Sequence, residues 1–166
     1  MARAIGVLLE GGCDRVLVVA GASADVAAAL LEETGWSEDP AVDVVVAADW
    51  DEGMGASLRT GLSAAMGSAA SCALVSLVDL PDVGSDVVRR VLGRTSPDES
   101  TVARATYGGR PGHPVLLGRD HWAKVLATAQ GDKGARDYLA AHRTVLVECG
   151  DLATGRDTDT PDDLRG

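Results

Sequence analysis

The chain has 166 residues and a mass of 17.0 kDa, which suits one domain built around one hydrophobic core. Its 25 acidic and 15 basic residues give a formal net charge of −10, which argues against nucleic acid or an anionic membrane surface as a partner, because both need a basic face. No apolar run approaches the ~20 residues of a membrane-spanning helix, and residues 1–10 show no signal peptide.

Hydrophobic patterning predicts strands that alternate with helices. Short Val-rich runs indicate buried strands, and Ala/Leu-rich periodic segments indicate helices. Alternating elements joined by short loops predict a three-layer α/β/α domain, Rossmann-like, with a mostly parallel sheet. The predicted elements are, in chain order, the end of a helix over 3–10, a strand over 15–20, a helix over 25–33, a strand over 43–48, a helix over 56–66, a strand over 72–78, a helix over 86–93, a strand over 101–106, a loop over 108–112, a strand over 114–117, helices over 119–129 and 133–142, and a strand over 144–148.

Composition also constrains the core and the compartment. Hydrophobic residues make up 46% of the chain, but only 3% of it is aromatic and Phe is absent, so Val, Leu and Ala must fill the core. Cys13, Cys72 and Cys149 each lie in or beside an apolar run. An odd number of scattered cysteines favours buried free thiols over metal ligands or a disulfide, and it predicts a cytoplasmic protein.

The segment 76–82, SLVDLPD, holds the first candidate for chemistry. Asp79 follows a predicted buried strand, and ligands of such sheets bind beyond the carboxyl ends of the strands. This placement suits a Mg²⁺ ligand, because Mg²⁺ takes one or two protein carboxylates together with phosphate oxygens. The alternative is that Asp79 only caps the turn into the next helix.

The segment 51–62, DEGMGASLRTGL, places two glycines before a predicted helix. Gly53 and Gly55, on either side of Met54, would let the backbone approach a ligand, and the free N–H groups of a helix start favour an anionic or carbonyl oxygen. Ser57 adds a hydroxyl group. The alternative is an ordinary helix start with glycine punctuation, and no GxxxxGK[ST] loop occurs in the chain.

Two further loops carry candidate side chains. The Gly- and Pro-rich loop 108–112 leads to His113, although an isolated His beside a strand can be purely structural. With no Ser or Cys partner implied, we exclude a nucleophilic triad. The segment 131–136, GDKGAR, contains Asp132 as a predicted helix N-cap and Arg136, whose planar guanidinium suits a phosphate.

The last candidate segment is 155–164, GRDTDTPDDL. Asp157 and Asp159 project to the same side if this segment is extended, so both would face one metal ion. The Thr160 and Pro161 pair predicts the start of a short helix. The alternative is a solvated acidic tail.

Five strings in this order resemble signature stretches of the MobA-like NTP transferase family, and most closely its molybdenum cofactor cytidylyltransferase branch. Each string is short, and their number and order carry the resemblance. It implies the nucleotide-diphospho-sugar transferase type of α/β fold. The strings are GMGASLRTGL, LVDLP, GRPGHPVLL, GDKGAR and DTDTPDDL, which together span residues 53–164.

The activity that the resemblance implies is transfer of CMP from CTP, or of another nucleotide from its NTP, to a molybdopterin-type acceptor, with release of pyrophosphate. The acceptor phosphate attacks the α-phosphorus in line, and a Mg²⁺ bridging the phosphates offsets the crowded negative charge. By motif position, Asp79 is the catalytic metal ligand, with Asp157 or Asp159 as a second ligand. The residues that the resemblance assigns to nucleotide or acceptor are Gly53, Met54, Gly55, Ser57, His113 and Arg136.

The family begins with a strand and a glycine-rich loop carrying an Arg and, shortly after, a Lys. This chain begins in what resembles the helix after that loop, so roughly 30–40 residues are expected to be absent. The explanations are a start assigned too late, a shortened chain or lost activity. Because that loop cradles the triphosphate, we expect residues 1–166 to bind NTP weakly and to transfer nucleotide slowly.

Two alternatives to the cytidylyltransferase hypothesis stay open. The first is the same chemistry with another phosphorylated acceptor, such as a sugar phosphate or phospholactate. The second is a non-catalytic binding protein that keeps the cleft and delivers cofactor to a molybdoenzyme. The absent loop favours this second alternative, whereas the carboxylates of Asp79, Asp157 and Asp159 oppose it.

Overall fold

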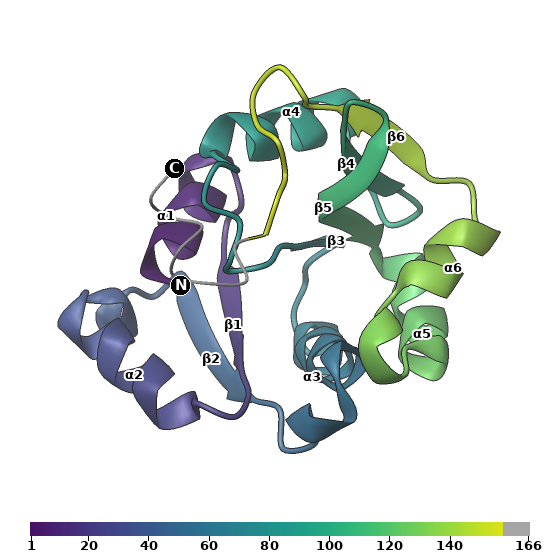
Figure 1. Ribbon diagram of the computed structural model, residues 1–166. Coiled ribbons are helices and arrows are strands. Elements are labelled where there is room, and N and C mark those ends of the chain that lie inside the picture. Colours follow the sequence, from purple (N-terminus) through teal and green to yellow (C-terminus); the bar gives the residue numbers. More distant parts are fainter. Residues whose placement is uncertain (158–166) are drawn as a thin grey trace.

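The computed structural model describes residues 1–157, and Figure 1 shows how their helices and strands are arranged. The helices are α1 (Ala2–Glu10), α2 (Ala24–Glu33), α3 (Met54–Met66), α4 (Ser85–Thr95), α5 (Arg119–Thr128) and α6 (Arg136–Ala141). The strands are β1 (Val16–Ala20), β2 (Val42–Val46), β3 (Cys72–Val75), β4 (Val102–Tyr107), β5 (Arg110–Gly118) and β6 (Val145–Glu148). Short 3-10 turns are η1 (Trp36–Glu38), η2 (Trp50–Glu52) and η3 (Gly131–Lys133).

The strands form two sheets. β1 and β2 pair in parallel, with Val16 opposite Val42, and the second sheet has the order β3-β5-β4-β6. β4 and β6 are parallel, whereas β5 runs antiparallel to both β3 and β4 because a tight turn joins it to β4. The predicted α/β fold with a mostly parallel sheet is therefore confirmed, with β5 as the antiparallel exception.

Helices cover both faces of the strands, which gives three layers (Figure 1). On one face, α1 and α2 bury Ile5 and Leu31 against β1, and α4 packs beside α1 over β4, β5 and β6. On the other face lie α3, α5 and α6, where Trp122 of α5 is fully buried against Leu117 of β5. The core consists mainly of Val, Leu and Ala, as the low aromatic content predicts.

Three predicted element boundaries are wrong. The strand expected over 72–78 ends at Val75, so Asp79 lies in a turn beyond the strand. The loop expected over 108–112 is only a turn, because Tyr107 already pairs with Arg110 and the hairpin begins there. The helix expected over 133–142 is α6 alone, preceded by η3, so Asp132 lies inside a 3-10 turn instead of capping a helix.

The other elements follow the predictions closely. Cys13, Cys72 and Cys149 are free thiols as expected, although only Cys149 is fully buried. Among the described residues, no helix has both the length and the apolar character needed to cross a bilayer.

In residues 1–157, β1 pairs only with β2 and β3 pairs only with β5, so the sheet is divided between β1 and β3. The expectation of a family strand ahead of residue 1 concerns no described residue and stays a prediction.

We predict that Leu116→Ala lowers the free energy of unfolding by about 2–5 kcal/mol, because Leu116 is fully buried on β5 between β3 and β4 and its removal leaves a cavity. Leu146→Ala, on β6 at the edge of the same sheet where the residue is 59% exposed, should change it by only about 0.5 kcal/mol or less. Urea unfolding of both variants measures the difference, and equal losses would show that β5 is not the centre of the core.

Candidate functional site

The turn after β3 carries Asp79, whose side chain is exposed. This turn is held in place by Asp82, whose carboxylate accepts hydrogen bonds from the backbone N–H of Thr154 at 2.5 Å and from its hydroxyl at 2.6 Å. Burial alone would raise the pKa of Asp82, but these hydrogen bonds outweigh it and lower the pKa. The contact brings the chain around Thr154, and with it Asp157, beside the turn of Asp79.

His113 lies on β5 next to this turn. Its backbone carbonyl accepts a hydrogen bond of 2.6 Å from the hydroxyl of Tyr107, which fixes its position. Burial lowers the pKa of His113, and the charge of Arg104 lowers it further, while the negative charges of Asp79 and Asp157 act in the opposite direction. The imidazole is therefore neutral at neutral pH, and two carboxylates and one guanidinium lie near it.

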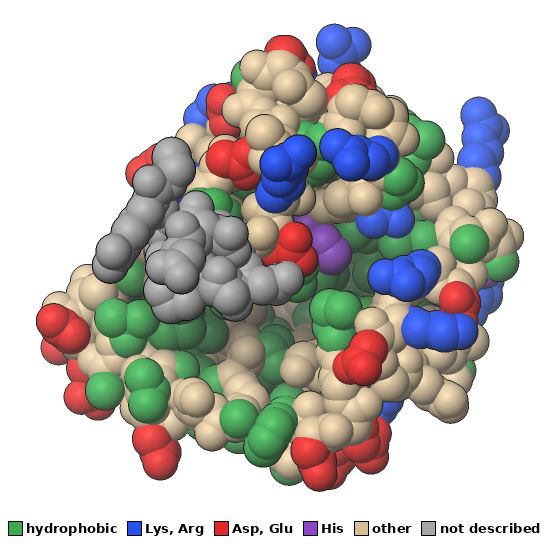
Figure 2. Space-filling model, viewed as in Figure 1, with side chains coloured by type: hydrophobic (Ala, Val, Ile, Leu, Met, Phe, Trp, Pro, Cys, Tyr) green, Lys and Arg blue, Asp and Glu red, His purple; other side chains and the backbone are tan. Residues whose placement is uncertain are grey.

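Two arginines belong to the same neighbourhood. Arg104 on β4 donates from Nε and Nη2 to the carbonyl of Gly112, at 3.3 and 3.2 Å, directly beside His113. Burial lowers the pKa of Arg104, and the charge of Arg136 at the start of α6 adds to this effect. Figure 2 shows acidic and histidine side chains at the edge of a hollow on this face, with Lys and Arg side chains around its margin.

The glycines before α3 have a structural partner that the sequence does not reveal. An added Cβ on Gly53 would lie 2.4 Å from Oδ1 of Asp132, and one on Gly55 would lie 2.9 Å from the backbone of Gln130. Gly53 also has φ +106, a conformation that favours glycine. These glycines therefore allow the close approach of the 130–132 segment, whereas contact with a ligand stays a prediction.

The packing of the glycines before α3 against residues 130–132 brings together two of the predicted strings, GMGASLRTGL and GDKGAR. A Cβ added to Gly134, the residue after η3, would lie 4.0 Å from the Met54 side chain. In addition, Arg59 of α3 donates a hydrogen bond of 2.8 Å to the carbonyl of Ala129. Met54 is 44% exposed and Ser57 is half-buried in the first turns of α3. An open pocket beside Arg59 lies on the flank of this unit and includes none of the candidate carboxylates.

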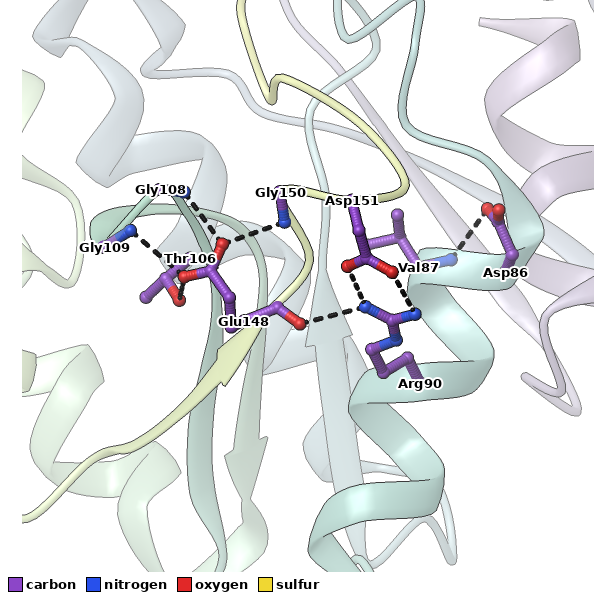
Figure 3. Close-up of polar contacts among 9 residues, drawn as sticks. All are labelled: Asp86, Val87, Arg90, Thr106, Gly108, Gly109, Glu148, Gly150 and Asp151. Atoms are coloured by element: carbon purple, nitrogen blue, oxygen red, sulfur yellow. Dashed lines mark hydrogen bonds and ion pairs between the residues drawn. The ribbon is translucent and has the colours of Figure 1, made fainter.

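Glu148, at the end of β6, forms the most extensive polar cluster of this end of the sheet (Figure 3). Its carboxylate accepts hydrogen bonds from the hydroxyl of Thr106 at 2.8 Å and from the backbone N–H groups of Gly108, Gly109 and Gly150 at 2.8, 3.1 and 2.9 Å. These hydrogen bonds, that of Thr106 foremost, lower the pKa of Glu148 to about 2.

Arg90 of α4 fastens the same end of β6 to the helix layer. Its guanidinium donates to the backbone carbonyl of Glu148 at 3.1 Å and forms a two-pronged ion pair with Asp151, in which Nη2 lies 2.8 Å from Oδ2 (Figure 3). The segment that leads to Asp157 is thus held to α4 before it reaches the turn of Asp79.

The structure gathers the predicted residues into two groups. Asp79, His113 and Asp157 form the first, and Gly53, Met54, Gly55 and Ser57 belong to the second, which packs against the segment before Arg136. Asp159 lies outside the described residues, as do Thr160 and Pro161. Among residues 1–157, no group of three or more His, Cys, Asp or Glu side chains has the arrangement of a metal site.

Sequence reasoning missed Arg104, Tyr107 and the hydrogen bonds of Glu148. Arg104 offers a signal, because it is the one charged residue within the strand-like run TVARATY. Tyr107 offers none, and the position of Glu148 at the end of a predicted strand indicates only that its segment lies at the ligand-binding edge of the sheet. The partners of both residues lie elsewhere in the sequence and become neighbours only in the folded sheet.

Comparison with known proteins gives a consistent result. The chain matches the MobA-like NTP transferase domain over residues 1–145. It is 32% identical over 166 residues to nicotine blue oxidoreductase of Paenarthrobacter nicotinovorans, covering 95% of this chain and 76% of that protein.

Solved structures share the fold. Rv0371c from Mycobacterium tuberculosis H37Rv is 27% identical with a TM-score of 0.73, covering 99% of this chain and 79% of that one, and it has also been solved in complex with manganese. A nucleotidyl transferase from Methanothermobacter thermautotroptrophicus is 24% identical with a TM-score of 0.75, covering 99% of this chain and 76% of that one.

We predict that Glu148→Gln destabilises the protein in a pH-dependent way. Because folding lowers the pKa of Glu148 from 4.5 to about 2, its contribution is complete above pH 4.5 and is lost as the pH falls toward 2. The difference in free energy of unfolding between parent and variant should therefore shrink across that range. Glu33→Gln, which removes an exposed carboxylate of α2, is the control, and a pH-independent difference for Glu148→Gln would contradict the assignment.

We predict that Gly55→Ala lowers the free energy of unfolding by about 1–3 kcal/mol, because the new Cβ meets the backbone of Gln130 and Gly131. Gly93→Ala is the matched control in α4. Its Cβ meets nothing within 4 Å, so it should raise stability by about 0.5–1 kcal/mol. Thermal unfolding with calorimetry measures both changes, and an unaffected Gly55 variant would show that the 130–132 segment is loosely packed.

Proposed function

This chain belongs to the MobA-like NTP transferase family, and from that membership we propose that it transfers CMP from CTP to a molybdopterin-type acceptor. The family is one of nucleotidyltransferases, which gives the chain an enzyme-like role and supports an NTP as the proposed substrate. The base and the acceptor are the parts that we propose, on the strength of the five strings between residues 53 and 164.

The observation that carries the proposal is that the charges of Arg104, Asp79 and Asp157 all act on the imidazole of His113, while Arg104 is hydrogen-bonded to Gly112, the residue before His113. Two carboxylates and a guanidinium therefore bring both negative and positive charge to one site. Phosphoryl-type transfer needs both, because a cation must bridge the phosphates while basic groups hold the remaining charge.

The donor set fits a divalent cation. Asp79 and Asp157 supply hard carboxylate oxygens, and Mg²⁺ commonly binds through one or two carboxylates plus phosphates of the substrate. When bound, the metal would offset the negative charge that accumulates during attack on the α-phosphorus.

In this proposal, the side chains of the protein position the substrates and do not transfer protons. A phosphate monoester is largely dianionic at neutral pH, so the attacking oxygen needs no general base. His113 is neutral because burial lowers its pKa, and a neutral imidazole has one N–H that would orient a phosphate oxygen. Met54 and Ser57, at the start of α3, would line the nucleotide or pterin side.

One observation favours a second candidate function. The curated relative at 32% identity is named nicotine blue oxidoreductase, so a reduction reaction on this fold is a specific alternative. Oxidation of NADH or NADPH in the presence of nicotine blue tests it directly. Turnover there, without CTP-dependent transfer, would replace the nucleotidyltransferase proposal.

We predict that Asp79→Asn abolishes most Mg²⁺-dependent behaviour while the protein folds normally, since Asp79 is exposed and adds little packing. Protection against thermal unfolding by CTP and Mg²⁺ should disappear. Transfer to molybdopterin should fall on the order of a hundredfold, because loss of even an outer-shell partner of a metal costs up to that much.

The control for this experiment is Asp25→Asn, which removes an equally exposed carboxylate on α2 far from the site. Both variants change the net charge equally. If Asp79→Asn keeps parental protection at limiting Mg²⁺, Asp79 is only a turn residue.

The same assays test the base and the acceptor. Protection by UTP or ATP in place of CTP would show that the protein uses another base, and turnover of a sugar phosphate or phospholactate would show that it uses another acceptor. Protection without turnover of any acceptor would indicate a non-catalytic cofactor-binding protein.

A further inference from the structure

Tyr107, the last residue of β4, contacts two of the segments that carry candidate site residues. Its side chain is only 5% exposed, and it belongs to the same core cluster as Leu80 of the Asp79 turn and Ala153 of the C-terminal segment. Burial raises the pKa of its hydroxyl group. The hydroxyl therefore stays protonated and donates the hydrogen bond of 2.6 Å to the backbone carbonyl of His113.

Two glycines leave room for the ring of Tyr107. A Cβ added to Gly112, the residue before His113, would lie 2.7 Å from Cε2 and 2.9 Å from Cδ2 of this ring. A Cβ added to Gly155 would overlap the same two atoms. Because both glycines face one pair of ring atoms, β5 and the segment of Gly155 meet at one edge of Tyr107. A side chain at either position would push the ring and the backbone apart.

The segment around Gly155 leads directly to a candidate carboxylate. Thr154, the residue before it, is held by the carboxylate of Asp82 through its N–H and its hydroxyl. Gly155 has φ +64, a conformation that favours glycine. Asp157 follows two residues later, and its negative charge acts on the imidazole of His113. The chain that packs on the edge of Tyr107 therefore returns to the histidine that Tyr107 also holds.

We propose that Tyr107 is a positioning residue that sets the place of Asp157 relative to His113. Its hydroxyl holds the strand of His113 and its ring holds the backbone at Gly155, an arrangement that we call the Tyr107 clamp. The role of Asp157 as a metal ligand rests on the proposed function, whereas the clamp itself does not. A ligand carboxylate must be held within about 0.5 Å of its productive position, and the groups that hold it commonly contribute about ten- to a hundredfold to metal affinity.

Gly155→Ala tests the clamp, because the new Cβ overlaps the ring and displaces the segment of Asp157. Gly35→Ala is the matched control. Gly35 also has a positive φ, +77, but a Cβ added there meets nothing within 4 Å, so this variant introduces backbone strain without the contact. Two further variants act on the ring itself, since Tyr107→Phe keeps it and Tyr107→Leu removes it.

The measurement is a nuclear magnetic resonance titration with Mn²⁺ alone, a paramagnetic ion that suits the same oxygen ligands as Mg²⁺. Mn²⁺ bound beside His113 broadens the proton resonances of its imidazole, which are assigned by their absence from His113→Gln. The imidazoles of His121 and His142, which pack around Tyr138 of α6, are internal controls. In the parent protein, the His113 resonances should broaden at lower Mn²⁺ than the other two.

The variants should divide into two classes. Gly155→Ala and Tyr107→Leu should each need about tenfold more Mn²⁺ for the same broadening of His113. Gly35→Ala and Tyr107→Phe should match the parent. A purely structural role of Tyr107 would lower the Tm of the variants and leave the Mn²⁺ dependence unchanged. Since Gly155 lies outside the helices and strands, its variant keeps the test valid even if Tyr107→Leu unfolds.

A transfer assay separates the clamp from the proposed function. Gly155→Ala should raise the Mg²⁺ concentration for half-maximal transfer by about tenfold, with little change in kcat at saturating Mg²⁺. If the Mn²⁺ dependence shifts as expected but the parent transfers no nucleotide, the clamp stands and the proposed function fails. Equal behaviour of Gly155→Ala and Gly35→Ala, or no selective broadening of His113 in the parent, overturns the clamp whether or not transfer occurs.

Discussion

The carboxylate of Glu148 holds together the parts of the chain on which the site depends. It accepts hydrogen bonds from the end of β4, from both glycines of the turn into β5, and from the first residue after Cys149. Because β5 carries His113 and the chain after Gly150 carries Asp157, one carboxylate fixes the beginning of both segments. Its lowered pKa of about 2 is the electrostatic consequence of serving four donors at once.

Each of those segments is then held a second time closer to the site. Tyr107 fixes the backbone of His113, and Asp82 fixes Thr154 beside the turn of Asp79. Arg90 ties the same chain to α4 through Asp151. The residues proposed to bind metal and phosphate therefore sit on turns and strand ends, but those turns are anchored by hydrogen bonds to regular elements.

Much of this architecture could be predicted from the sequence, because Val-rich runs and Ala/Leu periodicity are local signals. The strand positions of β1, β4 and β6 and the helices α2 and α4 follow from them within a few residues. The antiparallel direction of β5 could not be predicted, since it depends on how tight the Gly108 turn is. The sequence predicts a loop over 108–112, whereas the hairpin already begins with the pair of Tyr107 and Arg110.

The candidate site was predictable to a lesser degree. Asp79 and His113 stand in recognisable strings, whereas the role of Arg104 depends on Gly112, which becomes its neighbour only in the folded sheet. The glycines before α3 show the opposite error. Their spacing suggests an approach to ligand, yet their close neighbour is the 130–132 segment, more than seventy residues further along the chain.

The similarity to a nucleotidyl transferase structure and to a relative named for an oxidoreductase indicates that this fold alone does not determine the reaction. The charges of the side chains in the site still limit the substrate. Carboxylates and a guanidinium that act on the same imidazole suit substrates that bring both a cation and phosphates. NADH and NADPH also carry phosphates, so this charge distribution suits the cofactor of the alternative reaction as well as CTP, and the assays with CTP and with nicotine blue distinguish the two reactions.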